Sequence, residues 1–116
     1  MKHLQHLAAA AIAWIIVDGD TVKAPYGVTY RVLGYDAPET HFAKCEAERR
    51  LGHAATRRFE ALLSSGEVTV RESGRIDKYG RTLATVYVNG RNVSEIMIAE
   101  GFARAYDGGK RQGWCP

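Results

Sequence analysis

Residues 17–40 read VDGDTVKAPYGVTYRVLGYDAPET, and they give the clearest indication of the fold. Its β-branched and aromatic residues favour strands, and its glycine and proline residues interrupt them. From Val28 to Leu33 the side chains alternate, so that Tyr30 and Arg31 lie on opposite faces of one strand. The pattern predicts three short strands, over Trp14–Val17, Thr21–Ala24 and Val28–Leu33, with Gly34 and Pro38 ending the third.

A long helix is predicted from Glu46 to Leu63, because apolar residues recur there at helical spacing and Ser64-Ser65-Gly66 then ends the pattern. Its expected buried face carries Ala47, Leu51, Ala54, Ala55, Phe59, Leu62 and Leu63. Its expected solvent face carries Glu48, Arg49, Arg57, Arg58 and Glu60. Arg50 is expected on the same face, because a run of basic residues on a helix usually forms its solvent-exposed side.

The remaining chain predicts two more strands and a short helix. Alternating residues begin a strand at Val68, and another covers Leu83–Val88 before the turn Asn89-Gly90. The short helix is expected from Val93 to Glu100, with Gly101 after it. Residues 107–116 are rich in glycine and charge, which indicates an irregular tail.

This order of elements predicts an α+β fold that is mainly β. A five-stranded OB-fold barrel with two helices packed on it explains the first helix as a plug for one end of the barrel. An open sheet with one exposed face is the alternative. The chain has 116 residues without a repeat or linker, so residues 1–116 are expected to form one domain, with a leading segment over residues 1–11.

Composition excludes several classes of protein. Hydrophobic residues make up 46% and charged residues 25%, which excludes a disordered chain and a collagen-like fibre. No stretch approaches the roughly 20 apolar residues of a membrane span, so no membrane partner is expected. The first residues loosely imitate a signal peptide, but Gln5 and His6 interrupt the apolar run. An uncleaved first strand after a short leading helix is therefore favoured over a cleaved signal.

Carboxylates gather in two predicted loops, Asp18-Gly19-Asp20-Thr21 and Asp36-Ala37-Pro38-Glu39-Thr40. The first two aspartates share one side of an extended chain, and the proline fixes a turn that presents Asp36 and Glu39 together. Clustered carboxylates repel one another unless a cation lies between them, and oxygen ligands indicate a hard ion, calcium before magnesium. The alternative is that these are ordinary turn residues that cap backbone amides.

Two arginines accompany these acids. Arg31 lies in an otherwise apolar strand, and Arg81 ends the turn Asp77-Lys78-Tyr79-Gly80-Arg81. Guanidinium groups bind phosphate oxygens with two parallel hydrogen bonds and stay charged. A hard cation, a carboxylate and two arginines together suit phosphodiester cleavage. Surface solvation or a structural ion pair is the alternative for both arginines.

Three motifs together resemble the staphylococcal nuclease, or thermonuclease, family. They are VDGDT (residues 17–21), RVLGYDAPET (31–40) and DKYGRTLA (77–84), and their order and the intervening helix agree with the family over about residues 12–106. The resemblance implies an OB-fold barrel and a calcium-dependent nuclease. The implied substrate is DNA or RNA, cut with little sequence preference into products with 3′-phosphate and 5′-hydroxyl ends.

The resemblance also implies roles for individual residues. The implied calcium ligands are Asp20, Asp36 and the backbone carbonyl of Ala37. The implied catalytic residues are the two phosphate-contacting arginines and a proposed general base, namely Arg31, Arg81 and Glu39. The implied substrate-binding residues are Lys78 and Tyr79 for a terminal phosphate and, by a loose alignment, Tyr106 for the base.

The tail departs from the family's best-known member, because it lacks that protein's long third helix. It resembles shorter members from bacteria instead, so a bacterial or phage origin is expected. Trp114 in this tail is expected to pack, in preference to stacking on a base. If Asp18, Asp20, Asp36 and Glu39 form one pocket, nine other acids face 16 basic residues, and this basic exterior suits a polyanion held by its backbone.

Three function classes are compared. An active nuclease is favoured, since all the acids and arginines of the family pattern are present. A barrel that binds nucleic acid but has lost catalysis is the alternative, and a protein-interaction barrel is the third. A monomer is expected.

Cys45 and Cys115 leave three readings open: two unrelated thiols, a disulfide that tethers the tail to the helix start, or a zinc site with His41 or His53. Zinc is disfavoured, because no paired ligands at short spacing are present. The expected cellular location of the protein depends on which of the first two readings holds. A disulfide indicates a secreted or periplasmic protein, and free thiols indicate a cytoplasmic one.

Overall fold

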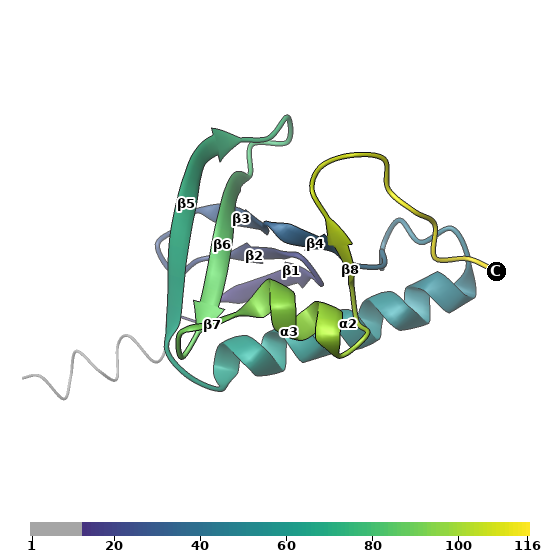
Figure 1. The fold of residues 1–116 in the computed structure, drawn as a ribbon, viewed down its shortest axis with the longest axis horizontal. Helices are drawn as coiled ribbons and strands as arrows, with labels where there is room; N and C mark the ends of the chain where they lie inside the picture. The colour runs from purple at the N-terminus through teal and green to yellow at the C-terminus, as the bar shows by residue number, and fades with distance from the viewer. Residues whose placement is uncertain (1–12) are drawn as a thin grey trace, which may run out of the picture.

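The computed structural model describes residues 13–116, and its elements follow the predicted order (Figure 1). The strands are β1 (Ile15–Asp18), β2 (Thr21–Lys23), β3 (Thr29–Val32), β4 (Gly34–Asp36), β5 (Val68–Ile76), β6 (Thr82–Val88), β7 (Arg91–Asn92) and β8 (Arg104–Tyr106). The helices are α2 (Glu46–Ser64) and α3 (Val93–Ala99). The expectations for the leading segment, residues 1–11, lie outside the described residues. Across the described part of the chain, no helix has both the length and the apolar character needed to cross a membrane.

The main sheet has the strand order β1-β2-β3-β6-β5, with β7 added beside β6. The strands β3 and β6 are parallel, and the other pairs in this sheet are antiparallel. The predicted α+β class is confirmed. The described pairings form a path from β1 to β5, so closure of this sheet into a barrel stays a prediction.

The strand β4 is the main departure from the predicted order of strands. Gly34 was expected only to end a strand, but its positive φ of 102° turns the chain into β4. There β4 leaves the main sheet and pairs with β8 in a separate antiparallel sheet, with Asp36 opposite Arg104. The sequence did not indicate this pairing, because each strand is only three residues long.

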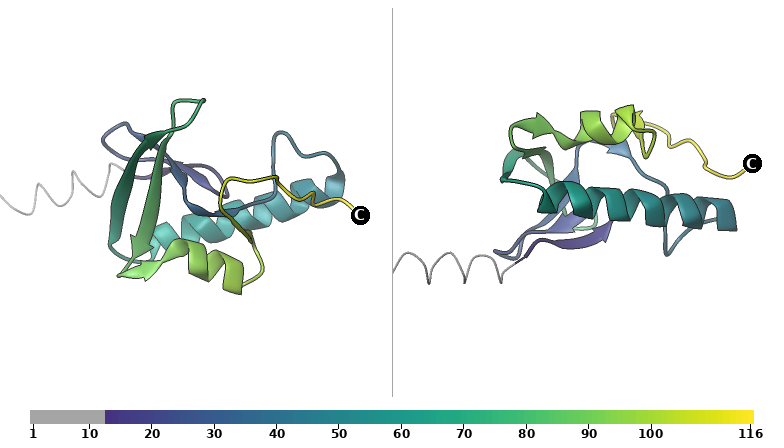
Figure 2. Two further views of the ribbon diagram at one scale, coloured as in Figure 1. Left: turned by 45° about the horizontal axis from the view of Figure 1, so that its top comes forward. Right: turned by 90° about the horizontal axis from the view of Figure 1, so that it is seen from below.

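The long helix α2 packs against β1 and α3 (Figure 2). Its C-terminal half buries Ala55, Phe59, Leu62 and Leu63, as the helical spacing predicted. Its first half differs from the prediction, because Leu51 is 45% exposed whereas Glu48 is only 5% exposed. The cause is that this half faces the polar loop between β4 and α2 instead of an apolar sheet.

Two residues of α2 bind this loop. The carboxylate of Glu48 accepts the backbone N–H groups of Glu39 at 3.1 Å and Lys44 at 3.0 Å. Gly52 packs directly against the backbone carbonyl of Glu39, since a Cβ there would lie 2.4 Å from that oxygen. The start of α2 therefore holds the segment that carries Glu39.

The tail, residues 107–116, contains no helix or strand, as predicted. It is nevertheless attached to the body of the protein at several points. Trp114 stacks on Arg104, whose guanidinium carbon lies 3.8 Å from the indole centroid, so packing on the protein is what the structure shows for this residue. At the end of the tail, Cys115 is joined to Cys45, with 6.1 Å between the Cα atoms.

Gly52→Ala should destabilise the protein by about 1–3 kcal/mol, because the new methyl group would overlap the Glu39 carbonyl. Helix propensity alone would give the opposite sign, a gain of about 1 kcal/mol. Equilibrium unfolding in urea measures the change. Ala61→Gly, at an exposed position of the same helix, is the control and should lose about 1 kcal/mol. A more stable Gly52→Ala variant would contradict the close contact.

Glu48→Gln should destabilise the protein by about 1–3 kcal/mol, because an amide presents one acceptor oxygen to two backbone donors. Burial opposes ionisation, but these hydrogen bonds lower the pKa of Glu48 below its usual 4.5. A lowered pKa adds stability above pH 4.5 that is lost as the pH falls through the folded-state value.

The difference between wild type and Glu48→Gln should therefore shrink when unfolding is measured at increasingly acidic pH. Glu60→Gln, an exposed position on the same helix, should change stability by less than about 0.5 kcal/mol at any pH. If the stability difference between wild type and Glu48→Gln stayed constant down to pH 2, the charged form of Glu48 would not be the one that stabilises the fold.

Candidate active site

The two acidic loops meet, as the sequence predicted. The hydroxyl group of Tyr35 donates to the carbonyl of Gly19 at 2.7 Å, and the backbone N–H of Ala37 donates to Asp20 Oδ2 at 3.2 Å. The loops approach so closely that a Cβ at residue 19 would lie 2.7 Å from the Cβ of Ala37. Glycine at this position therefore allows Asp20 and Asp36 to share one site.

Arg31 lies between the two aspartates. Its Nη1 donates to the carbonyls of Val32 at 2.6 Å and Tyr35 at 2.9 Å. Its Nη2 lies 3.6 Å from Asp20 Oδ2 and 3.5 Å from Asp36 Oδ1, and the side chain is only 12% exposed. The backbone carbonyls thus fix the guanidinium group. Of the two alternatives for Arg31, surface solvation is wrong, whereas the structural ion pair is present with both aspartates.

Asp36 has an oxygen without a hydrogen bond. Its Oδ1 is buried and lies 3.0 Å from Arg111 Nε and 3.5 Å from Arg31 Nη2, but neither contact has hydrogen-bond geometry. Burial raises the pKa of Asp36, and the two arginines counteract only part of that shift. A buried carboxylate oxygen that lacks a donor is suited to receive a cation.

Asp18 is the third acid of the cluster. Its Oδ1 accepts the backbone N–H of Asp20 at 3.1 Å, so the turn-capping alternative holds for this residue. Burial raises the pKa of Asp18 to about 7, and the adjacent carboxylate of Asp20 adds to the effect. Burial and, to a lesser degree, the adjacent carboxylate thus disfavour the negative charge on Asp18, which a nearby cation would favour.

Arg81 is connected to the cluster through Thr21. Its Nη1 donates to the Thr21 hydroxyl at 3.0 Å, and that hydroxyl donates to Asp20 Oδ1 at 3.1 Å. Its Nε donates to Asp77 Oδ2 at 2.7 Å. Although burial acts against it, hydrogen bonds with Arg81 help to lower the pKa of Asp77. The strand register explains the approach, because β6 begins beside β3 directly after Arg81.

Glu39 is linked to Asp36 by Arg111, a residue that the sequence analysis did not single out. Arg111 Nη2 lies 3.0 Å from Glu39 Oε1, while Arg111 Nε approaches Asp36. The sequence contained only a weak signal for Arg111, a basic residue in a glycine-rich tail. Glu48, which holds the Glu39 backbone, was misassigned because helical periodicity alone placed it in solvent.

The three residues expected to bind substrate lie in two places. The ring of Tyr106 lies beside Arg31, with 5.9 Å from the ring centroid to the guanidinium carbon. Tyr79 is 72% exposed in the turn between β5 and β6, where Lys78 and Arg81 both lie over its ring at 5.3 Å. Each site tyrosine is thus paired with one of the two arginines.

A cleft of about 490 Å³ opens beside Asp36. Its wall is formed by β4, β8 and the tail, and it is lined by Gly34, Asp36, Arg104, Ala105, Tyr106, Asp107, Lys110 and Gln112. The lining carries two basic residues, Arg104 and Lys110, and two acidic residues, Asp36 and Asp107, so it has no excess of either charge.

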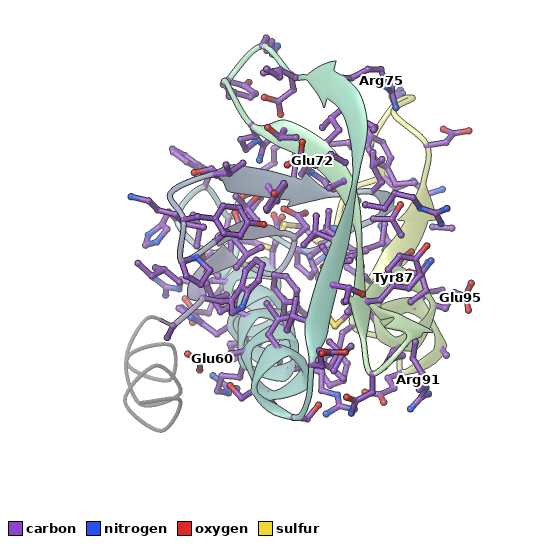
Figure 3. The ribbon with its side chains drawn as sticks, turned by 90° about the vertical axis from the view of Figure 1, so that its left-hand side faces the viewer. Glu60, Glu72, Arg75, Tyr87, Arg91 and Glu95 are labelled. Atoms are coloured by element: carbon purple, nitrogen blue, oxygen red, sulfur yellow. A yellow bond between two sulfur atoms is a disulfide. The ribbon has the colours of Figure 1, made fainter. Side chains whose placement is uncertain are left out.

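Several basic residues outside the site are paired with acids or lie on a surface that also carries acids. Figure 3 shows the face of β5 and β6, where Arg75 and Arg91 lie among Glu72, Glu95 and Tyr87. On α2, Arg58 binds Glu100 at 2.6 Å, and Glu46 pairs with both Arg49 and Arg50. These helix arginines therefore form the solvent-exposed face that the sequence predicted.

The cysteines form a disulfide in this structure, so neither serves as a zinc ligand. Within residues 13–116, no group of three or more histidine, cysteine, aspartate or glutamate side chains is arranged to hold a metal ion. The predicted calcium site contains only two carboxylates, Asp20 and Asp36, and needs the Ala37 carbonyl as a further ligand.

Comparison with known proteins agrees with this geometry. Residues 29–113 match the family model described as staphylococcal nuclease homologue. The SPbeta prophage-derived endonuclease YokF of Bacillus subtilis is 41% identical over 93 residues, which cover 76% of this chain and 31% of that protein.

Two further relatives support the match. Micrococcal nuclease of Shigella flexneri is 35% identical over 103 residues, covering 78% of this chain and 55% of that protein. Protein ParB of Escherichia coli is 34% identical over 122 residues, covering 86% and 63%. The chain thus spans less than two thirds of the length of each of these relatives. The family match and the joined acidic loops together show that the chain belongs to the staphylococcal nuclease homologue family.

Proposed function

We propose that this protein is a calcium-dependent nuclease that hydrolyses phosphodiester bonds in DNA or RNA with little sequence preference. The observation that carries the proposal is the convergence of Asp20 and Asp36 on one guanidinium nitrogen of Arg31, with Asp36 Oδ1 left without a hydrogen bond. The names of the relatives, two of which are an endonuclease and a nuclease, support the same activity.

The donor set fits a hard cation. Asp20 and Asp36 would supply carboxylate oxygens, and Ala37 would supply its backbone carbonyl. The unsatisfied Asp36 oxygen and the repulsion within the cluster favour such an ion. Calcium would neutralise the cluster and polarise a phosphoryl oxygen of the substrate.

The arginines are assigned to the phosphate. Arg31 approaches the aspartate cluster from β3 and Arg81 from the turn before β6, and both stay positively charged during turnover. Their N–H groups would bind the phosphoryl oxygens and stabilise the charge that develops there. The remaining carboxylate, Glu39, is partly exposed and is assigned to take a proton from the attacking water.

Tyr106, Lys78 and Tyr79 are assigned to substrate outside the reacting phosphate. Tyr106 lies beside Arg31 at the cleft, where its ring would pack against a base. Lys78 is assigned to a terminal phosphate from the turn that also carries Tyr79 and Arg81. Products with 3′-phosphate and 5′-hydroxyl ends follow from the family assignment.

We further propose that the protein acts in an oxidising compartment, outside the cell or in the periplasm. The support is the pairing of Cys45 with Cys115, since disulfides persist in such compartments and are rare in the cytosol.

Degradation of single-stranded DNA should require calcium and stop when a chelator is added, because the aspartate cluster cannot bind phosphate without a neutralising ion. Gel electrophoresis of the DNA after incubation measures the activity, and electrophoretic mobility shift measures binding in the same samples. Binding without degradation would identify the chain as a catalytically inactive nucleic-acid-binding protein. Degradation that continues in chelator would refute calcium dependence.

Arg81→Lys should lower turnover by roughly 10²-fold or more, because an ammonium group cannot make two parallel hydrogen bonds to a phosphate. Initial rates on DNA at saturating calcium measure the effect. Arg75→Lys is the matched control, because Arg75 is exposed on β5 and lies outside the site (Figure 3). Equal turnover for the two variants would remove Arg81 from the catalytic residues.

A further inference from the structure

Two different guanidinium groups contact Asp36. Arg31 approaches Oδ1 at 3.5 Å from within the fold, and Arg111 approaches the same oxygen at 3.0 Å from the tail. Arg111 also lies 3.0 Å from Glu39 Oε1. A single tail residue therefore bridges the two carboxylates of the second acidic loop.

The two arginines are held very differently. Arg31 is 12% exposed and donates to two backbone carbonyls, so it cannot move without breaking β3 and β4 contacts. Arg111 is 44% exposed, and within residues 13–116 its side-chain hydrogen bonds and ion pairs are with Asp36 and Glu39. If a metal ion reaches Asp36, Arg111 is therefore the residue expected to move.

The tail is attached on both sides of Arg111. Before it, the hydroxyl group of Tyr106 donates to the Gly109 carbonyl at 2.8 Å. After it, Arg104 Nη1 donates to the Gly113 carbonyl at 2.6 Å, and Cys115 is bonded to Cys45. Attachment at both ends keeps Arg111 at a high local concentration beside Asp36.

From this arrangement we propose that Arg111 is an internal cation that competes with the divalent metal ion for Asp36, and that the Cys45–Cys115 disulfide keeps it in the site. The inference rests on the proposed function, because it requires Asp36 to be a metal ligand. Two cations at one carboxylate oxygen repel each other. We expect a metal ion to displace Arg111, the less firmly held of the two arginines at this oxygen, so the free energy of its contacts is subtracted from that of ion binding.

Isothermal titration calorimetry of the full chain with calcium, without nucleic acid, tests the proposal. Arg111→Gln should bind calcium roughly fivefold or more tightly than wild type, because the competing charge is gone. Lys110→Gln is the matched control, since it removes the same charge from the neighbouring, exposed residue. Its effect should be clearly smaller. Equal changes in the two variants, or weaker binding by Arg111→Gln, would overturn the proposal.

The disulfide provides a second measurement. The double variant Cys45→Ser/Cys115→Ser should also bind calcium more tightly, and adding Arg111→Gln to it should change the affinity little. Serine caps a helix well, so the cap that Cys45 provides for α2 is retained. Thermal unfolding without metal checks that the variant is folded, and if it is not, the calorimetry of Arg111→Gln with the disulfide intact decides the proposal by itself. Fully additive effects would show that the disulfide does not act through Arg111.

Failure of this inference is distinguishable from failure of the proposed function. Wild-type protein that binds no calcium contradicts the proposed metal site, and the inference falls with it. Calcium binding by wild type that is unchanged in Arg111→Gln leaves the nuclease proposal standing and rejects only the competition.

Discussion

The site depends on the fixed position of the Arg31 guanidinium group. One of its nitrogens donates to the carbonyls of Val32 and Tyr35, and the other faces the carboxylates of Asp20 and Asp36. Without this positive charge, two buried carboxylates would repel each other across the junction of two loops. The charge also links β3 to β4 at the point where the chain leaves the main sheet, so the same contacts support both the fold and the chemistry.

Acid residues in this site are stabilised by groups with different mobility. Asp20 accepts the backbone N–H of Ala37 and also faces the firmly held Arg31, whereas Asp36 faces Arg31 and the more exposed Arg111. Fixed dipoles need no rearrangement when a ligand arrives, but a flexible arginine must move. Asp36 is accordingly the member of the cluster whose environment changes most easily, and its buried oxygen without a hydrogen bond marks the same place.

The first half of α2 holds the loop that carries Glu39 through contacts that its hydrophobic pattern does not predict. Glu48 accepts two backbone N–H groups of the loop, and Gly52 lets the Glu39 carbonyl approach the helix. Neither contact buries apolar area, so neither follows from the hydrophobic pattern that correctly predicted Phe59 and its neighbours in the core. The backbone position of a proposed catalytic residue therefore depends on a buried carboxylate and a missing side chain.

From the sequence alone one can predict the order of the main elements and the helix bounds to within about one residue. The meeting of the two acidic loops with Arg31 and Arg81 was expected from the resemblance of three motifs to a known family. Element order and helix bounds follow from periodicity and turn residues, which are local properties of the chain, whereas the meeting of the loops is a contact between distant segments that no local pattern predicts. The folded structure was needed to show the β4–β8 pairing, the burial of Glu48 and the position of Arg111 beside Asp36. Each of these joins segments far apart in the chain or sets a helix face against a polar loop, and contacts of this kind depend on the packed backbone, which leaves no periodic trace in the sequence.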